Sequence, residues 1–154
     1  MVSLVAITNT DSIATVSAYQ LQLLKDNANT LGIQDVFDGD QKLIPRTPAV
    51  CIVMGSKFRR LAGAPLRTDN NFTMHFMVYH SRIQDVQSNY RDVVILAEAI
   101  ERVLHGDLQM GGYIVQGWVT AVEPGLSVKE DGKSLLRSAR ITWEGLTRTI
   151  VPLS

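Results

Sequence analysis

Apolar residues recur three to four positions apart in two stretches of the chain, which is the spacing of one helix face. The first stretch covers residues 12–29 and ends before Gly32. The second follows the capping pair Asn89 and Asp92, has the more regular apolar stripe, and ends at Gly106. The pattern therefore predicts two amphipathic helices, well separated along the chain.

Most other apolar residues follow the period of two that is typical of strands. The clearest case is the segment NFTMHFMVY, in which Phe72, Met74 and Phe76 alternate with other side chains. Five strands are predicted, at residues 33–37, 49–57, 71–79, 113–122 and 139–151. The last two flank the turn-rich segment 123–134 and are expected to form a hairpin. The final strand is expected to direct Arg140, Thr142, Glu144 and Arg148 to one face, and Ile141, Trp143, Gly145 and Thr147 to the other.

These elements follow the order α-β-β-β-α-β-β, and their short connections favour antiparallel neighbours. A chain of 154 residues and 17.0 kDa has the size of one ordinary domain. We therefore predict an α+β fold with a single domain spanning residues 1–154. Its mainly antiparallel sheet would have about four to five strands, with two helices packed against it.

Composition and charge narrow the function. Hydrophobic residues make up 45% of the chain and charged residues 19%, which excludes wholesale disorder. Fifteen basic residues balance fifteen acidic ones, so bulk nucleic-acid binding is not expected. The apolar runs are far shorter than the roughly 20 residues of a membrane-spanning helix, and the first residues lack a signal-peptide pattern. We expect a protein with no membrane partner that stays where it is made.

The charges are unevenly distributed along the chain. Residues 1–40 contain five acids and one base, whereas residues 41–67 contain six bases and no acid. The acids are Asp11, Asp26, Asp35, Asp38 and Asp40, and the bases of the second segment are Lys42, Arg46, Lys57, Arg59, Arg60 and Arg67. We predict an exposed basic loop at about residues 55–71, with Phe58 as an apolar contact. It is either a solvated loop or an arm that meets an acidic neighbouring subunit or DNA.

The candidates for catalysis lack the spacing that known chemistries need. Gly132, Lys133 and Ser134 match the end of a phosphate-binding loop, but Ser127 stands where its first glycine would be. The three histidines lack the paired spacing of zinc ligands. Cys51 lies in the apolar run AVCIVM and is expected to be a buried small hydrophobe. We therefore predict no catalytic, cofactor-binding or metal-ligating residue, and a protein that is not an enzyme.

The aspartates around Gly39 are a further candidate site. Asp35, Asp38 and Asp40 lack the twelve-residue pattern of a calcium loop and its terminal glutamate. Aspartate is common in turns, so we expect a solvated turn at this position.

The order and texture of the segments resemble one known group of proteins. An N-terminal helix is followed by VFDGDQKLIPRTPAVCIVMGSK, a polar-tipped loop, NFTMHFMVYHS, the helix RDVVILAEAIERVL, and a closing strand pair that ends in RITWEGLTRT. This arrangement, over nearly the whole chain, is similar to that of bacteriophage tail terminator proteins. These small tail-completion proteins cap the tail tube at its head-proximal end.

The resemblance implies a homo-oligomeric ring, a hexamer, that ends tube polymerisation and offers a docking face to the head-side connector or stopper protein. Its partners would be the tail tube protein, that connector, and non-specifically the DNA that passes through the lumen. It also implies a place in the virion, at the head-proximal end of the tail, after assembly in the host cytoplasm. The family has no catalytic residues or cofactor to carry over.

A ring needs two different, complementary patches on each subunit. Residues 1–40 and 41–67 are candidates because their charges are opposite. The residues predicted to face a neighbouring subunit, the tube or DNA are Lys57, Phe58, Arg59, Arg60, Arg67, Arg140 and Arg148.

Two alternatives remain open from the sequence. The chain is also compatible with a head–tail connector or stopper of the phage neck, which would bind the portal-side adaptor instead of the tube end. The other alternative is a small α+β enzyme or ligand-binding domain, with a pocket near Trp118, Trp143 and His75.

Overall fold

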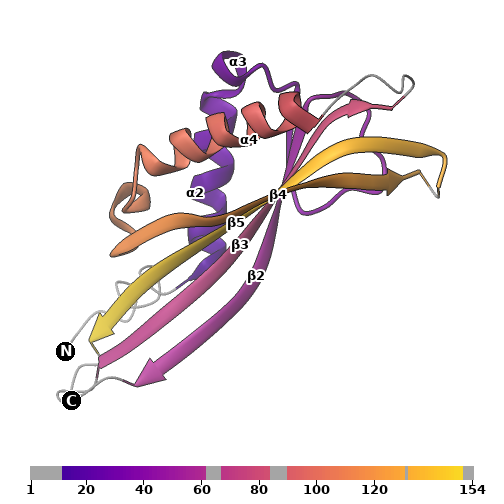
Figure 1. The fold of residues 1–154 in the computed structure, drawn as a ribbon. Coiled ribbons are helices and arrows are strands. Elements are labelled where there is room, and N and C mark those ends of the chain that lie inside the picture. The colour runs from indigo at the N-terminus through magenta and orange to yellow at the C-terminus, as the bar shows by residue number, and fades with distance from the viewer. Residues whose placement is uncertain (1–11, 62–66, 84–89, 131, 151–154) are drawn as a thin grey trace.

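The computed structural model describes residues 12–61, 67–83, 90–130 and 132–150. Within them the chain forms three α-helices, one 3₁₀ turn and five strands (Figure 1). In chain order these are α2 (Ile13–Asp26), α3 (Ala28–Leu31), β1 (Asp35–Asp38), β2 (Ala49–Leu61), β3 (Arg67–Arg82), α4 (Tyr90–His105), the 3₁₀ turn (Met110–Gly112), β4 (Gln116–Lys129) and β5 (Ser134–Ile150). The predicted α+β class and element order are confirmed, with the short helix α3 as an addition.

The five strands form one sheet in the order β1-β2-β3-β5-β4. The short β1 is parallel to β2, and all other neighbours are antiparallel. The main core lies between one face of this sheet and the helices α2 and α4. The mainly antiparallel sheet that the sequence predicts is therefore confirmed.

The strands β2, β3, β4 and β5 are all longer than the sequence indicates. The expected loop at about residues 55–71 is wrong in its outer parts, because β2 continues to Leu61 and β3 begins at Arg67; the centre, residues 62–66, lies outside the described part of the chain. The turn-rich segment 123–134 is likewise mostly strand, since β4 extends to Lys129. Polar and small residues form these extensions because backbone pairing continues beyond the core, where no alternation of apolar side chains is needed.

The alternation in β3 is confirmed by its burial. Phe72, Met74, Phe76 and Val78 are all buried and belong to the main core. They pack with the apolar stripe of α4 and with Val16 and Leu24 of α2; the buried members of that stripe are Val93, Leu96, Ala97, Ile100 and Leu104. In β5, Ile141, Trp143, Gly145 and Thr147 lie on the buried side, as predicted. The apolar side chains that the local periodicity identifies thus pack both helices against the same face of the sheet.

A second, smaller core lies on the opposite face of the sheet. It contains Ile44, Ala49, Cys51, Tyr79 and Leu136. Residues 39–48, which we call the strap, connect β1 to β2 and contribute Ile44 to this core. Cys51 is buried as predicted, and burial raises the pKa of its thiol to about 11, which disfavours a reactive thiolate.

Both long edges of the sheet are irregular. β1 pairs with β2 only as far as Ile52, so the rest of β2 has no second neighbour among the described residues, and its pairing with β3 is interrupted between Met54 and Lys57. On the other side β4 has a bulge between Val119 and Ala121 and contains Pro124, which lacks an N–H group. Proline cannot donate to the ladder and is tolerated on edge strands or at bulges, as in β4.

The largest buried side chain, Trp143, lies over two glycines that face each other on β4 and β5. A Cβ atom at Gly117 would lie 2.1 Å from the Trp143 ring, and one at Gly145 would lie 2.3 Å from it. No real Cβ contact is that short, so both positions require glycine for the indole to lie flat on the sheet.

We expect Gly145→Ala to destabilise the fold by about 2 kcal/mol, because an overpacked core must displace a rigid ring. The matched control is Gly125→Ala in β4, where an added Cβ would meet nothing within 4 Å. Urea unfolding monitored by tryptophan fluorescence should leave the control within about 0.5 kcal/mol of the wild type. Equal stability of the two variants would show that Trp143 does not pack as described.

Candidate interaction surfaces

Strand pairing brings six of the seven predicted interface residues to one end of the sheet. We define the basic end as residues 57–61 of β2, 67–71 of β3 and 146–150 of β5. Its cross-strand rows place Arg59 and Arg60 opposite Asn70 and Asp69 of β3, and Asp69 in turn lies opposite Arg148. Figure 1 shows the ends of these three strands projecting beyond α2 and α4. The basic residues that are separated in sequence therefore gather at one end of the sheet, with Lys57 and Arg59 on the helix side and Arg148 on the opposite face.

The side chains of the basic end are held by specific contacts. Arg59 Nε donates a hydrogen bond of 3.0 Å to Asn70 Oδ1, and the buried Asn70 Nδ2 donates one of 3.3 Å to Thr147 Oγ1. Arg148 Nε forms an ion pair of 2.9 Å with Asp69. Phe58 lies on the face opposite Arg59 and is 64% exposed. Among the side chains that the structure describes here, the basic end therefore combines paired polar groups with one protruding aromatic ring.

The remaining predicted interface residue, Arg140, lies elsewhere. It is eight residues before Arg148 on β5, roughly 26 Å along the strand. Its guanidinium forms an ion pair of 3.2 Å with Glu123 of β4. The predicted set of seven is therefore not one patch, and its two arginines on β5, Arg140 and Arg148, are each paired with a carboxylate.

The sheet face opposite the helices, beyond the strap, forms a second surface. Side chains from four strands contribute one row to it: Val53, His75, Thr142 and Ala121. Within the described residues, no helix packs on this row. Partial burial, and then the charge of Arg140, keep the pKa of His75 below its ordinary value. This open face therefore carries a neutral histidine and balanced ion pairs.

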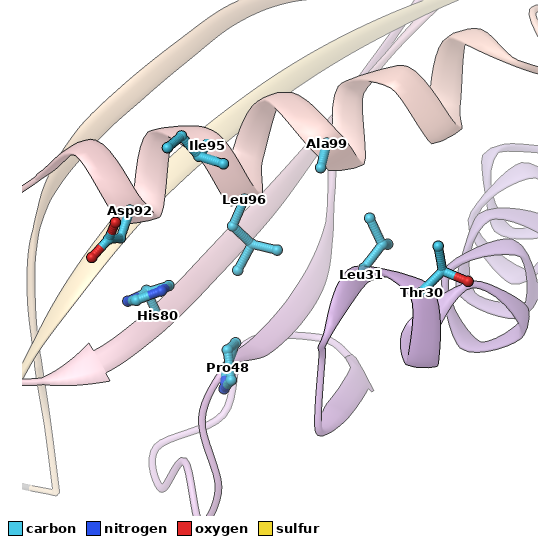
Figure 2. Close-up of a pocket in the computed structure, with 8 residues that line it drawn as sticks. All are labelled: Thr30, Leu31, Pro48, His80, Asp92, Ile95, Leu96 and Ala99. Carbon is cyan, nitrogen blue, oxygen red and sulfur yellow. The ribbon is translucent and has the colours of Figure 1, made fainter.

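A pocket of about 320 Å³ lies between α3, α4 and the ends of β2 and β3 (Figure 2). Its lining consists of Thr30, Leu31, Pro48, His80, Asp92, Ile95, Leu96 and Ala99. Figure 2 shows Asp92 and His80 at one end and Thr30 with Leu31 at the other. The sequence did not reveal this pocket, because four separate segments build it. One signal was available: Ile95 falls outside the buried stripe of α4 and is 56% exposed.

The strap is fixed by a cluster of polar contacts. The Tyr79 hydroxyl donates a 2.6 Å hydrogen bond to Asp40, and Lys129 Nζ forms a 2.9 Å ion pair with the same carboxylate oxygen. Arg82 donates to the carbonyl oxygen of Ile44 at 2.6 Å and pairs with Glu130 at 3.0 Å. These contacts join the strap to β3 and to the β4–β5 hairpin.

The aspartates of the first 40 residues do not form the solvated turn that the sequence predicts. Asp40 is paired with Lys129, and Asp35 forms a 2.6 Å ion pair with Arg46. Asp38 is exposed, as a solvated turn would require. The Asp35–Arg46 pair joins the acidic and basic segments within one subunit, and Asp40 is neutralised by Lys129, so the carboxylates of residues 35–40 are not an intact acidic patch.

The pocket expected near Trp118, Trp143 and His75 is not formed. Trp143 is buried in the main core, whereas Trp118 lies opposite Glu144, on the other face of the sheet. His75 also lies on that other face, opposite Thr142. The ligand-binding pocket that these three residues would line is excluded.

The other residues that the sequence offered as candidates for chemistry have structural roles. His105 Nε2 accepts a 2.9 Å hydrogen bond from the Val119 N–H group, which ties α4 to β4. Gly132 has a φ of +89° in the β4–β5 turn, and Ser134 starts a strand, not the helix of a phosphate-binding loop. In the part of the chain that the structure describes, no three metal-ligating side chains come together.

Two comparisons with known proteins find no match. No model of a protein family matches the chain, and no curated protein matches it. None of the helices described above is long and apolar enough to cross a membrane. The function must therefore be argued from the surfaces themselves.

The contacts of Asp40 predict how stability depends on pH. Burial opposes ionisation of this carboxyl, but the hydrogen bonds from Tyr79 and Lys129 outweigh it, so its pKa lies below the ordinary value of 3.8. The resulting stabilisation is fully present above pH 3.8 and is lost as the pH falls through the pKa of the folded state.

We expect Asp40→Asn to cost about 1 kcal/mol at pH 7, the usual contribution of such a contact, and to cost progressively less below pH 4. Urea unfolding of both proteins between pH 3 and pH 7 measures this difference. Asp38→Asn, two residues away at an exposed position, is the control and should show no such trend. A cost for Asp40→Asn that is the same at every pH would contradict the assignment.

Proposed function

We propose that this chain is a bacteriophage virion protein that caps the head-proximal end of the tail tube as a ring. The observation that carries the proposal is the basic end, which projects beyond the helices and carries the paired side chains of Arg59 and Arg148 and the exposed ring of Phe58. Such a surface is typical of a protein that works by contact with other proteins. The resemblance of the segment order to tail terminators supports the same function.

The charge distribution favours protein partners over DNA. Binding to DNA draws its strength from cations that neutralise phosphates and release counterions. Arg140 and Arg148 are each paired with a carboxylate, and the open face around His75 is balanced in charge. We therefore propose that these faces meet the neighbouring subunit or the tail tube, while DNA passes without a specific contact.

The shape of the subunit is also suited to a ring. A ring of identical subunits needs two unlike surfaces that fit each other after a closing rotation. The basic end and the end of the sheet that carries the strap differ in charge, in side chains and in the elements that form them. The complementary halves would therefore be these two ends, not the sequence segments 1–40 and 41–67.

The proposal is tested by the native mass of the purified protein, measured by light scattering over a concentration series, with electron microscopy of the same sample. We expect closed rings of about six copies, either alone or after addition of tail tubes, with one ring at one end of each tube. A protein that stays monomeric with tubes present would overturn the proposal. Rings that bind the portal-side adaptor and ignore tubes would also overturn it and indicate a neck stopper.

We expect the charge reversal Arg59→Glu with Arg60→Glu to abolish ring assembly or tube capping, because like charges would then oppose the contact. The matched control reverses Lys25 and Arg102, two exposed cations on α2 and α4. Since Arg59 also binds Asn70, circular dichroism and the unfolding midpoint must show that the variant is folded. Normal capped tails from the folded double variant would contradict a role for the basic end.

A further inference from the structure

The strap and the β4–β5 turn enclose two cavities at one end of the sheet. The cavities have volumes of about 380 Å³ and 260 Å³ and share Lys42 and Glu130 among their lining residues, and we call them together the lysine pocket. The N–H group of Glu130 donates a 3.0 Å hydrogen bond to the carbonyl oxygen of Lys42, which joins the strap to the turn here. Leu43 lines the larger cavity and Val128 the smaller one, and these side chains are 56% and 62% exposed. The lysine pocket therefore has apolar walls that face solvent.

The lysine pocket also carries two cations that no carboxylate neutralises. Lys129 and Glu130 each form one of the ion pairs that hold the strap. Lys42 and Lys133 are exposed, and neither forms an ion pair within the described residues. Asp131 of the same turn lies outside those residues. The pocket thus offers two ammonium groups to the carboxylate of a partner.

The complementary chemistry lies on the open face of the sheet, beside the basic end. Trp118 of β4 and Glu144 of β5 stand directly opposite each other in the strand register, so both side chains lie on the face away from the helices. Trp118 is 42% exposed, and Glu144 is exposed and has no ion-pair partner among the described residues. Arg140 and Arg148, the two arginines of β5 on this face, are already paired. The pair Trp118 and Glu144, which we call the tryptophan patch, combines an aromatic ring with a negative charge.

The tryptophan patch and the lysine pocket of one subunit cannot touch each other. Trp118 and Val128 are ten residues apart on β4, and Lys133 and Glu144 are eleven residues apart. At the rise of an extended strand the first separation is roughly 30 Å. Any contact between these two surfaces must therefore join two subunits.

We propose that the tryptophan patch of one subunit docks on the lysine pocket of the next subunit. The Glu144 carboxylate would lie between the ammonium groups of Lys42 and Lys133, and the Trp118 ring would pack against Leu43. This inference rests on the proposed ring and identifies the two surfaces that would close it. Tryptophan is among the residues that most often dominate the energy of interfaces, and opposite charges fix the partner and the register. Because the two surfaces are unlike, the contact is head-to-tail, and repeated with a closing rotation it gives a ring.

Charge reversal on either side tests the contact. Glu144→Lys makes the tryptophan patch positive, and Lys42→Glu with Lys133→Glu makes the lysine pocket negative. Each of these two variants alone brings like charges together. Light scattering under the conditions in which the wild type forms rings should show at least about a tenfold loss of assembly affinity for each.

The matched controls reverse exposed charges on the helices, with Glu98→Lys for the single variant and Lys25→Glu with Arg102→Glu for the double one. They should assemble as the wild type does, and circular dichroism and unfolding midpoints establish that all four variants are folded. A folded Glu144→Lys subunit that forms rings at the wild-type concentration would overturn the inference, while the proposed cap would stand. A wild type that forms no ring, even with tubes, would overturn both.

Mixing the two charge-reversed variants shows whether these surfaces meet each other. The positive patch of Glu144→Lys then faces the negative pocket of the double variant, and the remaining patch and pocket keep their natural charges. An equal mixture should therefore form rings again, which a merely structural effect of the substitutions would not allow. Two folded variants that stay unassembled when mixed would show that the patch and the pocket contact different partners, such as the tube protein, and would overturn the inference.

Discussion

The structure depends on the long antiparallel pairing of β3 with β5, which runs from Arg67 opposite Ile150 to Arg82 opposite Leu136. Side chains along this ladder alternate between the main core and the opposite face. A slip of one residue would bring Arg140 toward the helices and expose the apolar side chains that now pack there. The main core and the basic end are positioned by the register up to Tyr79, and a shift of one residue between Tyr79 and Ser81 sets the position of the strap contact made by Arg82.

Much of this fold could be predicted because its signals are local. The alternation of Phe72 and Phe76 and the helical spacing in α4 report on neighbours within the same element, so they indicated the correct faces. The strand ends could not be predicted in the same way. Residues 57–61 carry three cations because they extend beyond the core, and only their pairing with β3 shows that they are strand.

The surfaces were predicted less completely, because they depend on contacts between distant residues. The sequence identified the cations that form the basic end, but Arg140 could be separated from them only by its position on β5. Asp40 is paired with Lys129, which lies 89 residues further along the chain, and no local pattern signals such a pair. The same holds for the pocket around Ile95, whose walls come from four segments.

The irregular edges of the sheet affect the tendency of the free subunit to aggregate. Unpaired strand edges invite other chains to add to the sheet, which leads to aggregation. Pro124 and the bulge after Val119 interrupt one edge, and the irregularity between Met54 and Lys57 interrupts the other. These interruptions therefore oppose the edge-to-edge addition of further strands by which free subunits would grow into fibres.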